Sequence, residues 1–144
     1  MTDIYLKKYD NDDLYDIEID DLGDIKKTDS LDTALLMSVF CEKRADESEV
    51  INVDRRGGDW SNALNDVQDY EIGSKLWLLN QSRSSQENIL LGKNFIEEGL
   101  NWLIDDNIVK SILVNQSKDN RKFIYNIEIE QNNNSINNYL IDSL

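Results

Sequence analysis

The feature that most constrains the fold of this chain is a change of hydrophobic period near residue 107. From residue 85 to residue 106, apolar side chains recur every three or four positions, which predicts an amphipathic helix roughly 30 Å long. From residue 109 to residue 141 the period is two, which is typical of strands that bury one face. A helix followed directly by antiparallel strands predicts an α+β fold in which the helix packs on a small sheet.

The predicted long helix carries its own start and stop signals. Ser84 heads the capping-box sequence Ser84-Ser85-Gln86-Glu87, and Asn107 suits the left-handed position that ends many helices. Because each glycine in a helix costs about 1 kcal/mol relative to alanine, Gly92 and Gly99 indicate that another backbone passes close to this helix. The expected inward stripe consists of Ile89, Leu90, Lys93, Ile96, Leu100, Leu103 and Ile104.

Three strands are predicted after the helix. They cover Val109 to Val114, Lys122 to Gln131 and Ser135 to Ile141, with turns at residues 117–120 and 132–134. One face of the second strand is apolar throughout and is expected to face the helix. It consists of Phe123, Tyr125, Ile127 and Ile129.

Short strands are predicted at the start of the chain. The first 25 residues alternate in short apolar runs, which indicates a small hairpin or two edge strands. The acidic cluster Asp10-Asn11-Asp12-Asp13 would form the turn between them. This cluster lacks the glycine and the glutamate that an EF-hand calcium loop needs at its sixth and twelfth positions, so a solvated turn is the expected structure.

Two further helices flank a long loop. Asp29 or Ser30 can cap a helix over residues 30–43. Ser74 can cap a short helix near residues 74–80, whose leucines would face inward. Residues 45–72 have no hydrophobic period and form a long loop, which is typical of functional segments. All 144 residues are expected to form a single domain.

The composition argues against most catalytic and metal sites. The chain has no histidine, so a Ser-His or Cys-His catalyst is excluded and a zinc site is not expected. Its one cysteine, Cys41, lies at the end of an apolar helical pattern and is expected to be a small buried side chain. We therefore predict no catalytic residue, no bound metal and no cofactor.

Acidic charge is concentrated toward the start of the chain. The formal net charge is −14, whereas residues 107–144 carry four acids and four bases and are neutral. Such a field repels phosphate backbones and anionic membranes, so neither nucleic acid nor a membrane is an expected partner. The first residues do not resemble a signal peptide, which indicates a protein made and kept in the cytosol.

Three motifs occur in a distinctive order. Asp54-Arg55-Arg56-Gly57 lies in the long loop, Gly73-Ser74-Lys75-Leu76-Trp77-Leu78-Leu79 opens the short helix, and Trp102-Leu103-Ile104-Asp105-Asp106 closes the long one. With Arg83 between the last two, this arrangement resembles the Mu-like phage baseplate wedge family over nearly the whole chain. More distantly, it is similar to the wedge protein of T-even phages and to its type VI secretion relative, a group whose members have carried a lysozyme-like label.

The resemblance implies a non-enzymatic structural subunit of a contractile tail baseplate. Such a protein would be assembled in the host cytoplasm and reside in the virion, with six copies expected. Its partners would be other baseplate wedge proteins, tail sheath subunits, and the tail tube or hub. The resemblance further implies that the protein initiates the sheath, because the edge of its sheet would continue the strand pairing of the sheath.

Eight residues are predicted to contact partners. The two loop arginines can pair with carboxylates of this chain or of a neighbour as planar forks. Tryptophans in the loop and in the short helix can anchor an interface. The last strand carries no charge and offers an edge for strand addition. The set is Arg55, Arg56, Trp60, Trp77, Ile136, Tyr139, Leu140 and Ile141.

Two other functions compete with this hypothesis. A lysozyme-like hydrolase that degrades peptidoglycan would use two carboxylates, but a chain with 29 acids always offers some suitable pair, and a catalytic acid also needs a cleft that raises its pKa. An acidic inhibitor that mimics DNA would need carboxylates spread over one face. The concentration of charge toward the N-terminal half does not fit that requirement.

Overall fold

The computed structural model describes residues 2–8, 15–64, 71–80, 85–119 and 122–142. Helices and small antiparallel sheets make up these ranges, so the predicted α+β class is confirmed. The chain divides into two compact units, Met1–Met37 and Ser38–Leu144. Each unit is described by itself, and the single domain stays a prediction.

The first unit consists of two small antiparallel strand pairs. β1 (Asp3–Ile4) pairs with β4 (Lys27–Thr28), and β2 (Leu6–Lys8) pairs with β3 (Tyr15–Ile17), which confirms a hairpin near the start. The predicted turn at Asp10-Asn11-Asp12-Asp13 lies outside the described residues.

The helix α1 (Asp32–Phe40) starts in the first unit and ends in the second. The hydroxyl of Ser30 accepts a hydrogen bond from the amide of Asp32 at 3.4 Å, so one of the two predicted caps contacts the helix start. The predicted end at residue 43 is wrong. After Phe40 the backbone leaves the helix because Cys41 and Lys43 hydrogen-bond to Ser74, as described below.

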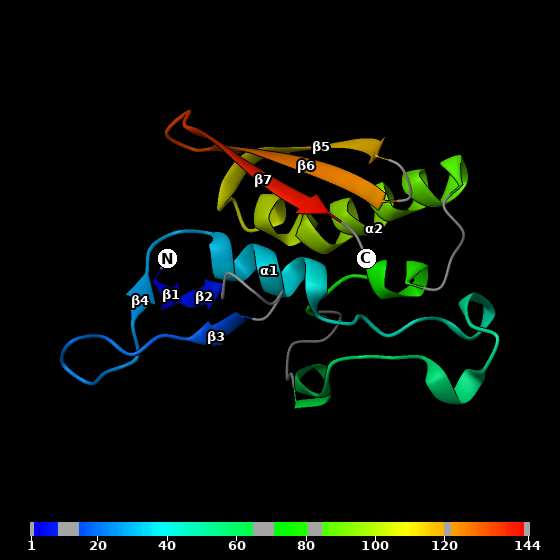
Figure 1. Cartoon of the computed structure of the whole chain (residues 1–144), viewed down its shortest axis with the longest axis horizontal. Coiled ribbons are helices and arrows are strands. Elements are labelled where there is room, and N and C mark those ends of the chain that lie inside the picture. The colour runs from blue at the N-terminus through cyan, green and yellow to red at the C-terminus, as the bar shows by residue number, and fades with distance from the viewer. Residues whose placement is uncertain (1, 9–14, 65–70, 81–84, 120–121, 143–144) are drawn as a thin grey trace. The chain divides into compact units, whose positions relative to one another are not determined.

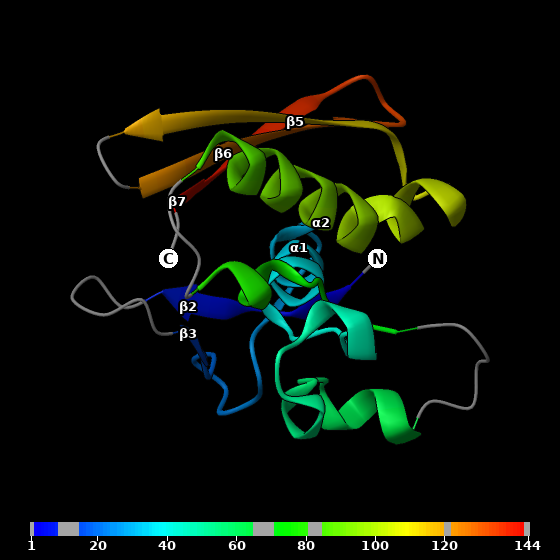
Figure 2. The ribbon, with the colours of Figure 1, turned by 90° about the vertical axis from the view of Figure 1, so that its right-hand side faces the viewer.

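The second unit is built on a three-stranded antiparallel sheet in the order β5 (Val109–Asp119), β6 (Lys122–Gln131), β7 (Ile136–Asp142). Figures 1 and 2 show α2 (Gln86–Asp105) lying along one face of this sheet. The four predicted inward residues of β6 are all buried, because alternate residues of a strand point to the same face. The predicted end of the first strand at Val114 is wrong. β5 extends to Asp119, across the described part of the turn predicted at 117–120, because it pairs with the whole length of β6.

The ends of α2 follow capping rules with one correction. Ser85, and not Ser84, is the cap: its hydroxyl accepts from the amide of Asn88 at 3.2 Å, while Ser84 lies outside the described residues. At the other end Asn107 has φ 56° and donates to the carbonyl of Ile104 at 2.9 Å. This bond and the hydrogen bond from the amide of Ile108 to the carbonyl of Leu103 together form a Schellman motif. The predicted end of the helix at Asn107 is therefore confirmed.

The buried stripe of α2 differs from the predicted one at its flanks. Leu90 and Ile104 are exposed, whereas Phe95 is buried. The buried face of α2 is rotated relative to the predicted stripe, toward the side on which Gly92 and Gly99 lie. A Cβ at Gly99 would stand 2.6 Å from the carbonyl oxygen of Ser38, which confirms a close backbone approach. At Gly92 the predicted backbone approach is wrong, because the close neighbour is the side chain of Tyr125.

Candidate functional site

The segment that opens the short helix is joined to the end of α1 by backbone hydrogen bonds. The amide of Ser74 donates to the carbonyl of Cys41 at 3.0 Å, and the amide of Lys43 donates to the carbonyl of Ser74 at 3.0 Å. Gly73 has φ +105°, and a Cβ there would overlap the carbonyl of Cys41. Only glycine therefore suits this position.

Ser74 links three parts of this unit. Its hydroxyl donates to the carbonyl of Val39 at 2.6 Å and accepts from the amide of Leu76 at 3.2 Å. The side chain is almost fully buried, so both hydrogen bonds are shielded from water. The short helix is a 3₁₀ turn over Leu76–Leu79, and its two inward leucines are buried as predicted.

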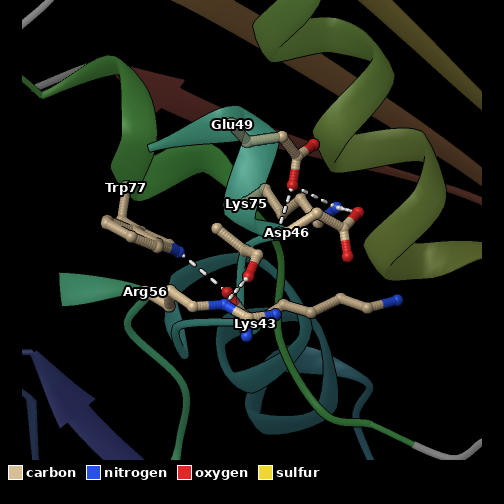
Figure 3. Close-up of polar contacts among 7 residues, drawn as sticks. Lys43, Asp46, Glu49, Arg56, Lys75 and Trp77 are labelled. Atoms are coloured by element: carbon tan, nitrogen blue, oxygen red, sulfur yellow. Dashed lines mark hydrogen bonds and ion pairs between the residues drawn. The ribbon is translucent and has the colours of Figure 1, made fainter. Parts of the chain in front are cut away.

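Two further side chains of the same segment hold the long loop (Figure 3). The ammonium of Lys75, whose side chain is 15% exposed, pairs with Glu49 at 2.7 Å and with Asp46 at 3.3 Å. Burial lowers the pKa of Lys75, but the hydrogen bonds to Glu49 and Asp46 outweigh burial and the pKa is raised. The indole of Trp77 donates to the carbonyl of Lys43 at 2.9 Å, and its ring covers Gly57.

The two loop arginines have different surroundings. Arg56 donates through Nε to the carbonyl of Ala45 at 2.7 Å, and its guanidinium lies 3.6 Å from Glu47. Its own carbonyl accepts from the amide of Ala45 at 2.8 Å. Arg55 is exposed and has no ion pair among the described residues. Arg56 therefore closes the loop internally, and Arg55 is the arginine that is free to contact another protein.

Exposed apolar side chains remain on the surface of this anchored loop. Trp60 begins a 3₁₀ helix and is 76% exposed. The backbone of this part is held because Asn62 exchanges two hydrogen bonds with the backbone of Ile72, at 2.8 and 3.1 Å. Three other large apolar residues of the loop are also exposed: Ile51, Val53 and Leu64. Of the two predicted tryptophans, Trp60 is thus available to a partner, while Trp77 is occupied internally.

The strand β7 forms one edge of the sheet, since it pairs only with β6 among the described strands. The turn before it is a type I turn with a bulge: Asn134 has φ 64°, and the amide of Gln131 donates to the carbonyl of Ser135 at 2.8 Å. Because hydrogen-bonded and non-hydrogen-bonded pairs alternate, the backbone groups of Ile136, Asn138 and Leu140 point toward the free edge.

The four predicted contact residues of β7 lie on two faces. Tyr139 and Ile141 face the same side as Ile127 and Tyr125, their partners in β6, and Ile141 is buried. Ile136 and Leu140 point to the outer face, where Leu140 is 70% exposed. A partner at this edge would therefore meet two apolar residues on the outside and one tyrosine on the inside.

The sequence of the described elements agrees with a family of phage proteins. A model of the family described as phage protein GP46 matches residues 31–136. This range is well over half of the chain and contains α1, the loop, the Gly73–Leu79 segment, α2, β5 and β6. The chain belongs to the phage protein GP46 family.

Two relatives identify where members of the GP46 family occur. The chain is 30% identical over 104 residues to the baseplate protein gp46 of Escherichia phage Mu, covering 71% of this chain and 70% of the relative. It is 31% identical over 86 residues to the Mu-like prophage FluMu protein gp46 of Haemophilus influenzae, covering 60% of this chain and 56% of the relative. The resemblance to a Mu-like phage baseplate family is thereby confirmed.

In the described part of this GP46-family chain, no carboxyl group has a raised pKa. Among the described residues, three carboxyl groups have a shifted pKa, Glu18, Asp59 and Glu130, and in each the pKa is lowered by hydrogen bonds from neighbouring side chains. A catalytic acid needs the opposite direction. Cys41 is half-buried, and burial, followed by the charge of Asp59, raises the pKa of its thiol. This shift disfavours the thiolate that a nucleophile requires.

The described residues contain no group of three or more potential metal ligands, and none of the helices among them is long and apolar enough to cross a membrane. The role of Lys75 as an anchor was not predicted, although it is the only charged residue of the Gly73–Leu79 segment and this was a usable signal. The exposed Ile51, Val53 and Leu64 were also missed; large apolar residues in an otherwise polar loop were the available sign.

Proposed function

We propose that this protein is a wedge subunit of a contractile phage tail baseplate that initiates polymerisation of the tail sheath by strand addition. The observation that carries the proposal is the free edge of β7, where Ile136–Ile141 carry no charge. The name of the phage Mu relative supports the baseplate role. The family match ends at Ile136, so the free edge is a feature of the β7 strand of this chain and is not drawn from the family.

The chemistry of the two sheet edges supports β7 as the receiving strand. β5, the other edge, carries Lys110, Lys118 and Asp119, and charged residues discourage pairing at an edge. In β7 the only charged residue is Asp142, at its end. An extended segment of a sheath subunit would gain backbone hydrogen bonds from Ile136, Asn138 and Leu140, and side-chain contacts from the apolar residues of β7.

The anchored loop supplies a second surface in this proposal. Trp60, together with the exposed apolar residues near it in sequence and with Arg55, would bind another wedge protein or the tail tube or hub. Aromatic residues and arginine are the residue types that dominate such interfaces. The protein would act without catalysis, in six copies within the virion baseplate, after assembly in the host cytoplasm.

Replacing Asn138 by proline tests strand addition. The amide of Asn138 points toward the free edge, so Asn138→Pro removes a donor from the receiving side and leaves the β6–β7 hydrogen bonds in place. Tails that carry this variant should build baseplates and tubes but no sheath, as seen by electron microscopy. Asn138→Ala keeps the amide and should assemble normally. Contractile tails of normal appearance from Asn138→Pro would refute sheath initiation by this edge.

A further inference from the structure

A carboxylate without a counter-ion lies at the centre of the outer face of the sheet. Glu128 stands on the middle strand, between Leu113 of β5 and Asn138 of β7 in register. Glu128 is half-buried, and its carboxylate makes no hydrogen bond or ion pair within the described part of the chain. Its neighbour Glu130 differs, because it pairs with Lys110 at 2.6 Å and accepts from Ser111 at 3.1 Å.

Apart from the ion pair of Glu130 with Lys110, the side chains around Glu128 are apolar or neutral. Leu113, Ile136 and Leu140 lie on the same face and are all exposed. Asn126 and Asn138, which have short amide side chains, also lie next to Glu128 on this face. Lys110 cannot pair with Glu128 without losing its hydrogen bonds to Glu130 and Asn134. The carboxylate of Glu128 therefore offers an unpaired negative charge to a cation on an incoming chain.

We infer that the strand added at β7 carries an arginine opposite Asn138, and that its guanidinium crosses this residue to bind Glu128. The inference rests on the proposed function, because it specifies the chemistry of the segment that the edge receives. Neighbouring strands lie about 4.8 Å apart, so an added strand would stand roughly 10 Å from β6. The long side chain of arginine and that of Glu128 span this separation over the short amide of Asn138.

Arginine fits this position better than lysine. Its planar guanidinium can bind the carboxylate of Glu128 with two hydrogen bonds and donate others to the amide oxygens of Asn126 and Asn138. Its aliphatic stem would cover part of the exposed Leu140. The pair would be partly shielded from water by the added strand, which strengthens it relative to an exposed ion pair.

This arrangement also disfavours pairing of β7 with the β7 of a second copy of this chain. Ile136–Asp142 contains no arginine or lysine, so two β7 strands paired with each other would leave both Glu128 carboxylates without a cation. The net charge of −14 adds repulsion between copies. Glu128 therefore selects a foreign basic segment and disfavours pairing between two copies, which is the discrimination that an initiator of another polymer needs.

The test measures binding of the purified chain to the purified, monomeric tail sheath protein of the same phage, at low and at high salt. Glu128→Gln keeps the shape of the side chain and should weaken binding roughly tenfold and reduce the salt dependence of the remaining affinity. Glu128→Arg should weaken binding further. Glu130→Gln is the matched control, since that carboxylate already pairs with Lys110, and should change the affinity less than twofold.

Two readouts separate this inference from the proposed function. Thermal unfolding of Glu128→Gln should match the parent, because Glu128 has no partner in the described part of the free protein. If Glu128→Gln binds like the parent at both salt concentrations while Asn138→Pro does not bind, strand addition stands and the arginine inference is refuted. If Asn138→Pro also binds like the parent, the proposed function itself is refuted.

Discussion

Tyr125 is a fully buried tyrosine whose hydroxyl donates to the carbonyl of Ile89 in α2 at 3.2 Å. Burial raises the pKa of Tyr125 to about 12, above the value near 10 of an unfolded chain. Between these two pH values the unfolded chain releases the proton and the folded protein retains it. The contribution of Tyr125 to the free energy of unfolding is therefore complete below pH 10 and is lost as the pH rises toward 12.

The effect of Tyr125→Phe on the free energy of unfolding should change sign between pH 7 and pH 11.5. At pH 7 the variant should be less stable by about 1 kcal/mol, because a buried hydrogen bond is lost. Above pH 10 this deficit should shrink and then become a gain, since phenylalanine does not ionise. Denaturant unfolding of both proteins at pH 7, 10 and 11.5 checks this expectation. A difference that stays constant over this range would contradict the assigned pKa.

Gly99 marks the point where α2 passes closest to the end of α1. Gly99→Ala should lower the melting temperature by several degrees, although alanine favours helices, because its Cβ would stand 2.6 Å from the carbonyl oxygen of Ser38. Asn94→Ala, at an exposed position of the same helix, is the control and should not lower it. A Gly99→Ala protein that melts like the parent would show that the backbone relaxes without cost.

The long loop illustrates how an element without periodicity is held in place. Residues 45–64 contain three short 3₁₀ helices, Glu47–Glu49, Val53–Arg55 and Trp60–Leu64. Lys75 pairs with Glu49 of this segment and the Trp77 ring packs on Gly57, while Arg56 bonds within the segment to the carbonyl of Ala45. Residues of the Asp54–Gly57 and Gly73–Leu79 motifs thus position the loop. The exposed side chains of the loop remain available to a partner.

Single substitutions should distinguish the internal role of Arg56 from the role of Arg55 in contacting a partner. Arg56→Ala should increase amide hydrogen exchange over residues 45–49, because it removes a hydrogen bond to the carbonyl of Ala45 and the ion pair with Glu47. Arg55→Ala should leave hydrogen exchange unchanged and weaken baseplate assembly, since Arg55 has no ion pair among the described residues. Faster exchange in Arg55→Ala would instead assign this arginine an internal role.

At the scale of the whole molecule, the acidic charge and the free edge of the sheet occupy different parts of the chain. The acidic residues are concentrated before residue 107, whereas the free edge of β7 and the outer face of the sheet belong to the neutral C-terminal segment. A neutral edge permits strand pairing, and the negative field of the remainder discourages contact between copies. The same distribution supports assembly with other proteins over self-association.

The sequence alone determined the α+β class, the long helix and most of the sheet. These elements have strong hydrophobic periods and local signals, such as Asn107 at the end of α2 and the asparagine turn before β7, and such signals act between residues close in the chain. The resemblance carried by the Gly73–Leu79 segment also led to the correct family.

Tertiary structure alone decided which side chains are available to a partner. The sequence shows two adjacent arginines and three tryptophans but not that Arg56 and Trp77 are occupied by the carbonyls of Ala45 and Lys43. The early end of α1 likewise follows from hydrogen bonds to Ser74, more than thirty residues away. Glu128 stands without a counter-ion only because strand register places neutral side chains around it, and such long-range pairing leaves no local pattern in the sequence.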